Sequence, residues 1–460
     1  MSTFPILQKK MPPANFVATR NACKLCTPLG AVLAFRGVEG ALPFLHGSQG
    51  CATYMRRYII SHFREPMDIA ASNISEASTV FGGIETFRQG IHNVQSQYHP
   101  ALIGIATTCL TETIGEDMNL LLNRLQQGDN ADVLPILVPV STPSYSGSHM
   151  DGFHGAVLSL VTSLSEDDGR TRTQVNLFPG MVSPADLRYL KEIMEDFGLP
   201  IALLPDYSET LDGPSLTEYR KIPAGGTPIA SIRATGSARC SIEFGHTLRL
   251  EKTAAAYLQK TWRVPAHRLG MPIGVHETDA FFAELEQISG CETPQKHALE
   301  RGRLIDAYVD GHKYVFGKRA IVYGEEDFVI GMVAFLAEIG VIPVLAASGG
   351  EGGHFAKAIA EVAPDLVGQI TVHEGMDFLS MEEAARNLKA DFVLGNSKGY
   401  TLSRHLQLPL VRVGFPIHDR FGGHRTLHLG YRGAQMLFDH IVNTLLEKKQ
   451  DDSSIGYSYL

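Results

Sequence analysis

An alternation of short apolar runs with helix-like segments constrains this sequence more than any other feature. Each run is rich in β-branched residues and ends in a turn of small residues, after which apolar positions recur with helical period. This pattern is typical of βα units, in which a helix carries the chain back so that the next strand pairs in parallel. We expect strands at residues 42–45, 102–106, 133–140, 175–178, 201–204, 320–323, 341–345, 392–394 and 410–413, and helices at 184–197, 327–339 and 433–447.

A chain of 460 residues is too long for one hydrophobic core, so several domains are expected. The pattern predicts fold class α/β, with three doubly wound, Rossmann-like domains built on parallel sheets with right-handed crossovers. We place them at residues 1–165, 166–305 and 306–460, the first carrying the candidate ligands and the last ending in a helix that packs back on the body. The stretch 213–268 is less regular than the rest.

Charge and hydropathy argue against two kinds of partner. The 40 Lys and Arg residues and the 49 Asp and Glu residues give a net charge of −9, spread along the chain without the basic stripe that phosphate backbones require. No apolar run approaches the length of a membrane span, and the first twenty residues lack the apolar core of a signal peptide. We therefore expect no nucleic acid partner, no membrane partner and a cytoplasmic location.

Six cysteines in so long a chain predict thiols or metal ligands instead of a disulfide framework. Cys51 and Cys109 each lie beyond the carboxyl end of an expected strand, where a helix-like segment begins, and Ser144 lies beyond the next strand in the same way. The carboxyl ends of parallel strands form a common crevice, so we expect these side chains to converge, with Cys26 as a third thiol. A helix N-terminus favours the thiolate, which is the form that binds iron.

Other interpretations of the cysteines remain open at this point. A single cysteine near a strand is more often a small core residue than a ligand. Cys23 and Cys26 form a C-x-x-C pair, which suits half a zinc site or a redox pair, although no second pair completes a zinc site and no expected strand precedes the motif. Cys240 and Cys291 have no partner motif, and Ser144 lies in a Ser/Thr-rich turn where hydroxyls commonly bond the backbone.

Short blocks in order along nearly the whole chain suggest a family. They are CTPLGA from Cys26, HGSQGC from His46, HFREP from His62, VFGG from Val80, TTCL from Thr107 with Glu112 after it, TPS from Thr142, LDGP from Leu211, GNS from Gly395 and GFPI from Gly414. Together these blocks resemble the β subunits of nitrogenase component 1. The resemblance implies three α/β domains, a homologous α subunit as partner and an α2β2 heterotetramer.

The same resemblance implies a cofactor and its ligands. In that family three β cysteines and three α cysteines hold an [8Fe-7S] P-cluster at the subunit interface, and the matching residues here are Cys26, Cys51 and Cys109. Ser144 matches a serine whose oxygen can ligate the oxidised cluster, as suits a hard alkoxide and more oxidised iron. An ATP-hydrolysing iron-sulfur reductase would dock and supply electrons, which the P-cluster relays to a catalytic metallocluster expected in the α subunit.

The nucleotide is expected on the reductase partner. Gly317-Lys318 is followed by Arg319 and lacks the upstream glycine of a phosphate-binding loop. The glycine-rich run at residues 349–353 does not fit a dinucleotide-binding fingerprint.

Departures from the family pattern leave the substrate open. Thr27 stands where molybdenum enzymes commonly have glutamine, and Cys23 adds a thiol near a ligand. A nitrogenase-like reductase that cleaves the C–S bonds of methylthio-alkanes would look similar. An assembly scaffold for the iron-molybdenum cofactor usually keeps only the cysteine of the GSQGC turn, so three cysteines and a serine favour the electron-transfer subunit. A non-redox binding module on the same fold is a third possibility.

Overall fold

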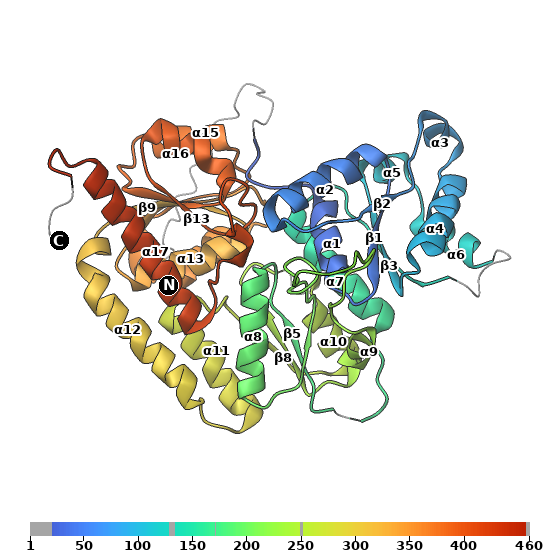
Figure 1. The fold of residues 1–460 in the computed structure, drawn as a ribbon, viewed down its shortest axis with the longest axis horizontal. Helices are drawn as coiled ribbons and strands as arrows, with labels where there is room; N and C mark the ends of the chain where they lie inside the picture. Colours follow the sequence, from blue (N-terminus) through green and yellow to red (C-terminus); the bar gives the residue numbers. More distant parts are fainter. Residues whose placement is uncertain (1–20, 128–133, 171, 249–251, 457–460) are drawn as a thin grey trace, which may run out of the picture.

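The computed structural model describes residues 21–127, 134–170, 172–248 and 252–456, and these form three parallel α/β sheets. Figure 1 shows the first sheet on the right, the second below and the third at the upper left. Every strand pair within the sheets is parallel, which confirms the predicted fold class. One expected strand residue, Val133, lies outside the described residues.

The first sheet is covered by helices on both faces, which is why its central strands are apolar without alternation. All residues of its central strands β1 and β3 are buried. Its strand order is β2 (Ala70–Ala71), β1 (Ala41–His46), β3 (Leu102–Thr107) and β4 (Ile136–Val140). The accompanying helices are α1 (Thr27–Arg36), α2 (Gln49–Phe63), α3 (Glu76–Phe81), α4 (Ile84–Tyr98), α5 (Cys109–Ile114), α6 (Met118–Gln126) and α7 (His149–Leu164).

The second sheet includes two strands that the sequence did not indicate. Its order is β6 (Ile201–Leu203), β5 (Val175–Phe178), β7 (Cys240–Phe244) and β8 (Ala266–Leu269), with helices α8 (Pro184–Asp196), α9 (Ile229–Arg233), α10 (Ala254–Trp262) and α11 (Gly274–Ser289). The stretch 213–268 is therefore more regular than expected. Buried Ser241 and Glu243 interrupt the apolar run of β7, and Ser241 is satisfied by a bond from Asn176 Nδ2 at 3.1 Å.

The third sheet has the expected central strands and one additional edge strand, β11. Its order is β11 (Thr371–His373), β10 (Ile342–Ser348), β9 (Arg319–Gly324), β12 (Phe392–Gly395) and β13 (Leu410–Arg412), with helices α13 (Glu326–Glu338), α14 (Phe355–Val362), α15 (Phe378–Ala385) and α16 (Tyr400–Leu406). Short 3-10 turns lie at Ala234–Ser237, Pro364–Leu366, Ser397–Gly399 and Gly423–Arg425.

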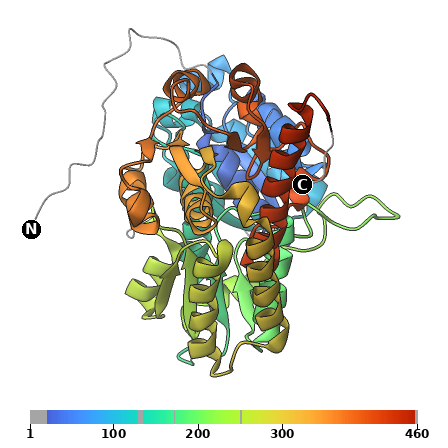
Figure 2. The same cartoon turned by 90° about the vertical axis from the view of Figure 1, so that its left-hand side faces the viewer.

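The C-terminal helix α17 (Gly430–Asp451) packs back on the body as expected. It runs beside α12 (Gln295–Val315) and also contacts α11 (Figures 1 and 2). Arg432 of α17 donates to Glu300 on α12 at 2.6 Å and to Glu192 on α8 at 3.1 Å. The domain boundaries at 165/166 and 305/306 remain predictions, and the second falls within α12.

Helices α1 and α7 cross so closely that their contact has no room for a side chain. A Cβ atom on Gly30 would lie 1.6 Å from the carbonyl oxygen of His149, and one on Gly152 would lie 1.8 Å from that of Thr27. All ten residues of α1 are buried, as expected for a helix that is apolar on every side. The crossing fixes the N-terminal end of α1, where Cys26 lies.

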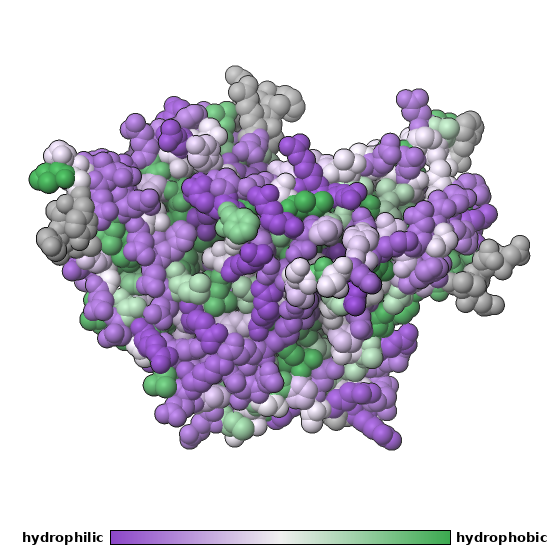
Figure 3. All heavy atoms as spheres, viewed as in Figure 1, coloured by the Kyte–Doolittle hydropathy of each residue, from purple (hydrophilic) through white to green (hydrophobic). Residues whose placement is uncertain are grey.

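Polar and charged side chains dominate the face of the molecule seen in Figure 3, with apolar side chains scattered between them. Within the described ranges, every helix is too short or too polar to cross a lipid bilayer.

Candidate metal centre

Cys51 and Cys109 lie just beyond the carboxyl ends of the neighbouring strands β1 and β3. Cys51 is in the first turn of α2, whose N-cap is Ser48, and the Ser48 hydroxyl donates to its Sγ at 3.8 Å. Cys109 is the first residue of α5, with Thr108 as N-cap. The predicted strand–turn–helix setting of both cysteines is confirmed.

The turns that carry these two cysteines touch each other. A Cβ atom on Gly47 would lie 2.1 Å from the Thr108 hydroxyl oxygen, so only glycine fits there. The Thr111 hydroxyl also donates to the carbonyl oxygen of His46 at 3.0 Å. Two turns far apart in the sequence are thus held side by side.

Cys26 and Ser144 lie close to Cys109. Cys26 is the N-cap residue of α1, and Ser144 lies between β4 and α7. The Ser144 amide donates to Cys109 Sγ at 3.3 Å, and its hydroxyl accepts from the Thr27 amide at 3.2 Å. The Ser144 hydroxyl also bonds the Cys26 thiol. The structure therefore brings the predicted residues together, while their role as ligands remains a prediction.

Cys26 is close enough to both other thiols for their charges to interact. Burial raises the pKa of the Cys26 thiol, the bond with Ser144 lowers it, and Cys109 and Cys51 raise it further. Burial therefore has the larger effect on the Cys26 thiol, although this residue caps helix α1. Three ionised thiols here would repel one another unless a cationic group lay between them, and iron would provide that charge.

The thiols face outward to different degrees. Cys109 is exposed, whereas Cys26 and Cys51 are half-buried. Across the parts of the chain that the structure describes, no set of three or more His, Cys, Asp or Glu side chains is arranged to hold one metal ion.

Cys23 belongs to a different environment from Cys26. It is buried among apolar side chains of the third domain, including Ile321 and Leu345, and burial raises its pKa to about 12. The two cysteines of the C-x-x-C motif therefore lie in unlike surroundings, which argues against a shared zinc or redox site. Cys240 is a buried thiol of β7, and Cys291 is exposed.

A set of hydroxyl and carboxylate contacts that the sequence analysis missed positions Ser144. Glu112 accepts from the Ser141 hydroxyl at 2.6 Å and from the Thr107 hydroxyl. Thr107 in turn accepts from the Thr142 amide at 2.8 Å. These bonds hold the turn of Ser144 beside the end of β3. The hydroxyl residues that end both strands were the only signal in the sequence.

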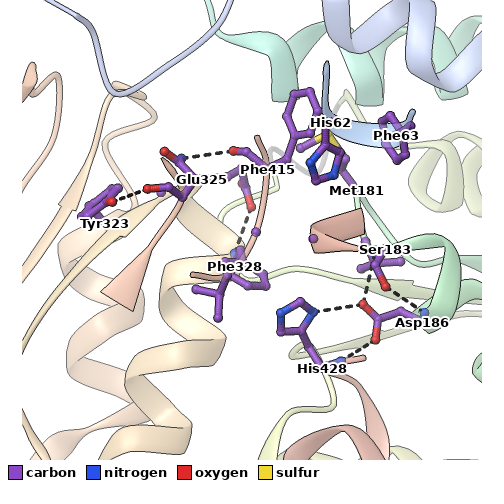
Figure 4. Close-up of a pocket in the computed structure, with 16 residues that line it drawn as sticks. His62, Phe63, Met181, Ser183, Asp186, Tyr323, Glu325, Phe328, Phe415 and His428 are labelled. Carbon is purple, nitrogen blue, oxygen red and sulfur yellow. Dashed lines mark hydrogen bonds and ion pairs between the residues drawn. The ribbon is translucent and has the colours of Figure 1, made fainter. Parts of the chain in front are cut away.

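A small cavity of about 40 Å³ marks the junction of the three domains (Figure 4). Its walls include His62, Phe415 and His428. The Asp186 carboxylate accepts from the His428 backbone amide at 2.7 Å and pairs with the Nδ1 atom of the His428 ring at 3.3 Å. Burial opposes ionisation of Asp186, but these bonds hold its pKa below the usual range. The cavity has room only for water-sized molecules, and none of the four predicted ligands lines it.

A larger cavity of about 650 Å³ is lined by residues of all three domains and reaches Thr27 and Pro143 beside the candidate centre. Its wall is acidic. Burial and the nearby Asp327 raise the pKa of Glu325 to about 8, and burial raises that of Glu326 to about 7. Both carboxylates accept bonds from backbone amides, so they act in part as caps for the surrounding loops.

The sequence and the fold both match known proteins. The sequence model of nitrogenase component 1 type oxidoreductases matches residues 26–446. The chain is 36% identical over 430 residues to the nitrogenase molybdenum-iron protein β chain of Clostridium pasteurianum, covering 93% of each chain. The chain belongs to the β-chain branch of the nitrogenase component 1 family. As a nitrogenase β-type chain, it is a subunit of an oxidoreductase complex.

Further relatives agree with this assignment. The β-type chain is 35% identical over 452 residues to the nitrogenase molybdenum-iron protein β chain of Azotobacter vinelandii, covering 95% of this chain and 86% of that one. A chain of the solved structure "Nitrogenase Cp1 at pH 6.5" superposes with a TM-score of 0.92 at 33% identity, over 98% of both chains. A chain of "Nitrogenase Cp1 at pH 5" matches with a TM-score of 0.67 at 16% identity, which shows the fold alone.

Proposed function

We propose that this β-type chain holds half of an interface [8Fe-7S] P-cluster through Cys26, Cys51 and Cys109, with Ser144 as an additional oxygen ligand. The observation that carries the proposal is the meeting of these four side chains, from four separate turns, at one place in a nitrogenase-type fold. The exposure of Cys109 suits a ligand set that another subunit completes.

The donor set fits an iron-sulfur group chemically. Thiolates are the usual protein ligands of iron-sulfur clusters, and amide bonds to the ligand sulfurs adjust the reduction potential. The Ser144 amide already donates to Cys109 Sγ. The Ser144 hydroxyl accepts from Thr27, so it is held next to the thiols where an oxidised iron could recruit it.

The proposal includes partners for this chain. A homologous α subunit would supply the remaining ligands and carry the catalytic metallocluster, and two such pairs would form an α2β2 heterotetramer. When bound, the P-cluster supplies one-electron transfer between an ATP-hydrolysing iron-sulfur reductase and that metallocluster. We propose no nucleic acid or membrane partner and a cytoplasmic location.

The test is metal analysis and substrate reduction by the complex purified with its α-type partner and its reductase. We expect several iron atoms per β-type chain and the absorption and electron paramagnetic resonance (EPR) signals of an iron-sulfur cluster. Reduction of dinitrogen would establish a nitrogenase, and cleavage of a methylthio-alkane would establish a C–S reductase. A complex that carries cofactor without turnover would indicate an assembly scaffold, and an iron-free, colourless complex would refute the proposal.

A further inference from the structure

The third domain holds the segment that leads into Cys26. The Cys23 amide donates to the Met376 carbonyl at 3.1 Å, and the Phe378 amide donates to the Asn21 carbonyl at 3.3 Å. Ala22 also forms an antiparallel bridge with Asp377. The loop of one candidate ligand is thus attached to a domain that contributes none of the four ligands.

Lys398 lies at the centre of this attachment. It follows β12 in a 3-10 turn, and its Nζ donates to the carbonyl oxygens of Ala22 and Lys24, the latter at 3.3 Å. Its carbonyl oxygen accepts from Asn21 Nδ2 at 3.3 Å, and its Nζ lies 6.0 Å from the centre of the Phe378 ring. One side chain therefore binds the carbonyl groups of the two residues on either side of Cys23.

The charge of Lys398 also lies close to the candidate ligand. Its ammonium group bonds the Lys24 carbonyl, two residues before Cys26 in the chain. Lys398 is half-buried, so water screens its charge less than that of an exposed lysine. The Arg56 and Arg64 side chains, by contrast, are exposed and bond Asp68 and the His418 carbonyl.

We propose that Lys398 is a positioning residue that clamps the Cys26 loop to the third domain and raises the reduction potential of the iron-sulfur cluster bound there. This inference rests on the proposed function. A reduced cluster carries one more negative charge than an oxidised one, so a fixed positive charge nearby stabilises the reduced form. Replacing that charge with a neutral side chain should make the cluster harder to reduce.

The test uses the full complex with its α-type partner and compares Lys398→Gln, Lys398→Met and Lys398→Arg with the unsubstituted protein. Lys357→Gln is the matched control, because Lys357 is a highly exposed lysine of the same domain that pairs with Glu361. Each complex is titrated with redox mediators while EPR reports the cluster. We expect the ratio of reduced to oxidised cluster at a fixed potential to fall about tenfold in Lys398→Gln and Lys398→Met, a shift of about 59 mV for a one-electron couple.

Lys398→Arg and Lys357→Gln should keep the midpoint of the unsubstituted protein, because both leave a cation at position 398. Unchanged midpoints and iron contents in Lys398→Gln and Lys398→Met would overturn the inference. If Lys398→Gln and Lys398→Met lose iron at an unchanged melting temperature while Lys398→Arg retains it, the result supports the clamp. Iron loss with a lowered melting temperature in all three variants would assign Lys398 a merely structural role. Absence of iron from the unsubstituted complex would instead refute the proposed function.

Discussion

The backbone amide of Ser144 donates to the Sγ atom of Cys109 at 3.3 Å, although the two residues lie 35 positions apart. The contact follows from the parallel register of β3 and β4, in which Ala106 lies opposite Val140 and the following turns end side by side. The Ser144 hydroxyl accepts from Thr27 and bonds Cys26, so Ser144 connects two of the three candidate thiols.

Substituting Cys51 or Cys109 with alanine should abolish the cluster. Each change removes one thiolate and leaves an iron without a ligand. We expect iron analysis of the purified complex to show loss of the cluster iron and activity to disappear. Cys291→Ala is the control, because Cys291 is an exposed thiol outside the predicted ligand set. Full iron content and turnover in both ligand variants would show that the assignment is wrong.

Ser144→Ala should have a milder effect than loss of a cysteine. The Ser144 amide still donates to Cys109, but the buried Thr27 amide loses its acceptor, which costs about 1–3 kcal/mol of folding stability. We expect iron to be retained and the spectrum of the oxidised cluster to change. Ser146→Ala, in the same turn, should leave that spectrum intact, since its hydroxyl donates to the Pro143 carbonyl. An unchanged oxidised spectrum in Ser144→Ala would remove Ser144 from the ligand set.

Gly30→Ala and Gly152→Ala should destabilise the protein and disturb the Cys26 site. The added Cβ atoms would overlap backbone carbonyl oxygens at the crossing of α1 and α7, and overpacking of this kind costs about 3 kcal/mol or more. Denaturant unfolding and iron content measure the two effects. The control Gly302→Ala lies on an exposed part of α12 with open space around it, and it should stabilise the protein by about 0.5–1 kcal/mol. Equal stabilities for all three variants would contradict the close packing.

Protonation of His62 should weaken the fold below neutral pH. Burial lowers the pKa of His62 to about 3, and its Nδ1 accepts from the Ile417 amide at 2.9 Å, so the folded protein keeps it neutral. The unfolded chain takes up this proton as the pH falls through 6.5, and stability therefore falls as the pH drops, by about 2 kcal/mol between pH 7 and 5.

The variant His62→Asn isolates this contribution, because asparagine can accept the same bond without titrating. Its unfolding free energy at pH 7 should be lower than that of the unsubstituted protein, but it should decline by about 2 kcal/mol less between pH 7 and 5. Denaturant titrations at both pH values provide the comparison. Parallel pH profiles for the two proteins would show that His62 does not titrate on unfolding.

The parallel strands and the convergence of the ligand turns could be predicted because both follow from local patterns. Strands buried on two faces, such as β3, appear as continuous apolar runs, and Cys51 and Cys109 lie in the first turns of the helices that follow two of them. Once the sheet is known to be parallel, the ends of its strands must meet at one edge.

Other features could not be predicted because they depend on contacts between distant segments. Helix α1 has no polar face, so its sequence lacks helical alternation. The buried polar residues of β7 interrupt the apolar run from which a strand would be predicted. The separation of Cys23 from Cys26 arises from bonds to the third domain. Lys398 contacts the Lys24 carbonyl across 374 positions, and no local pattern marks such a pair.

The dependence of the Cys26 loop on Lys398 has a practical consequence for chemists who want a minimal analogue of this half-site. A synthetic peptide would lack both the folded sheet and the distant segment around Lys398 that keeps the loop in place. A faithful mimic must therefore copy a complete architecture, including the tight helix crossing, before its sulfur atoms can be arrayed as they are here.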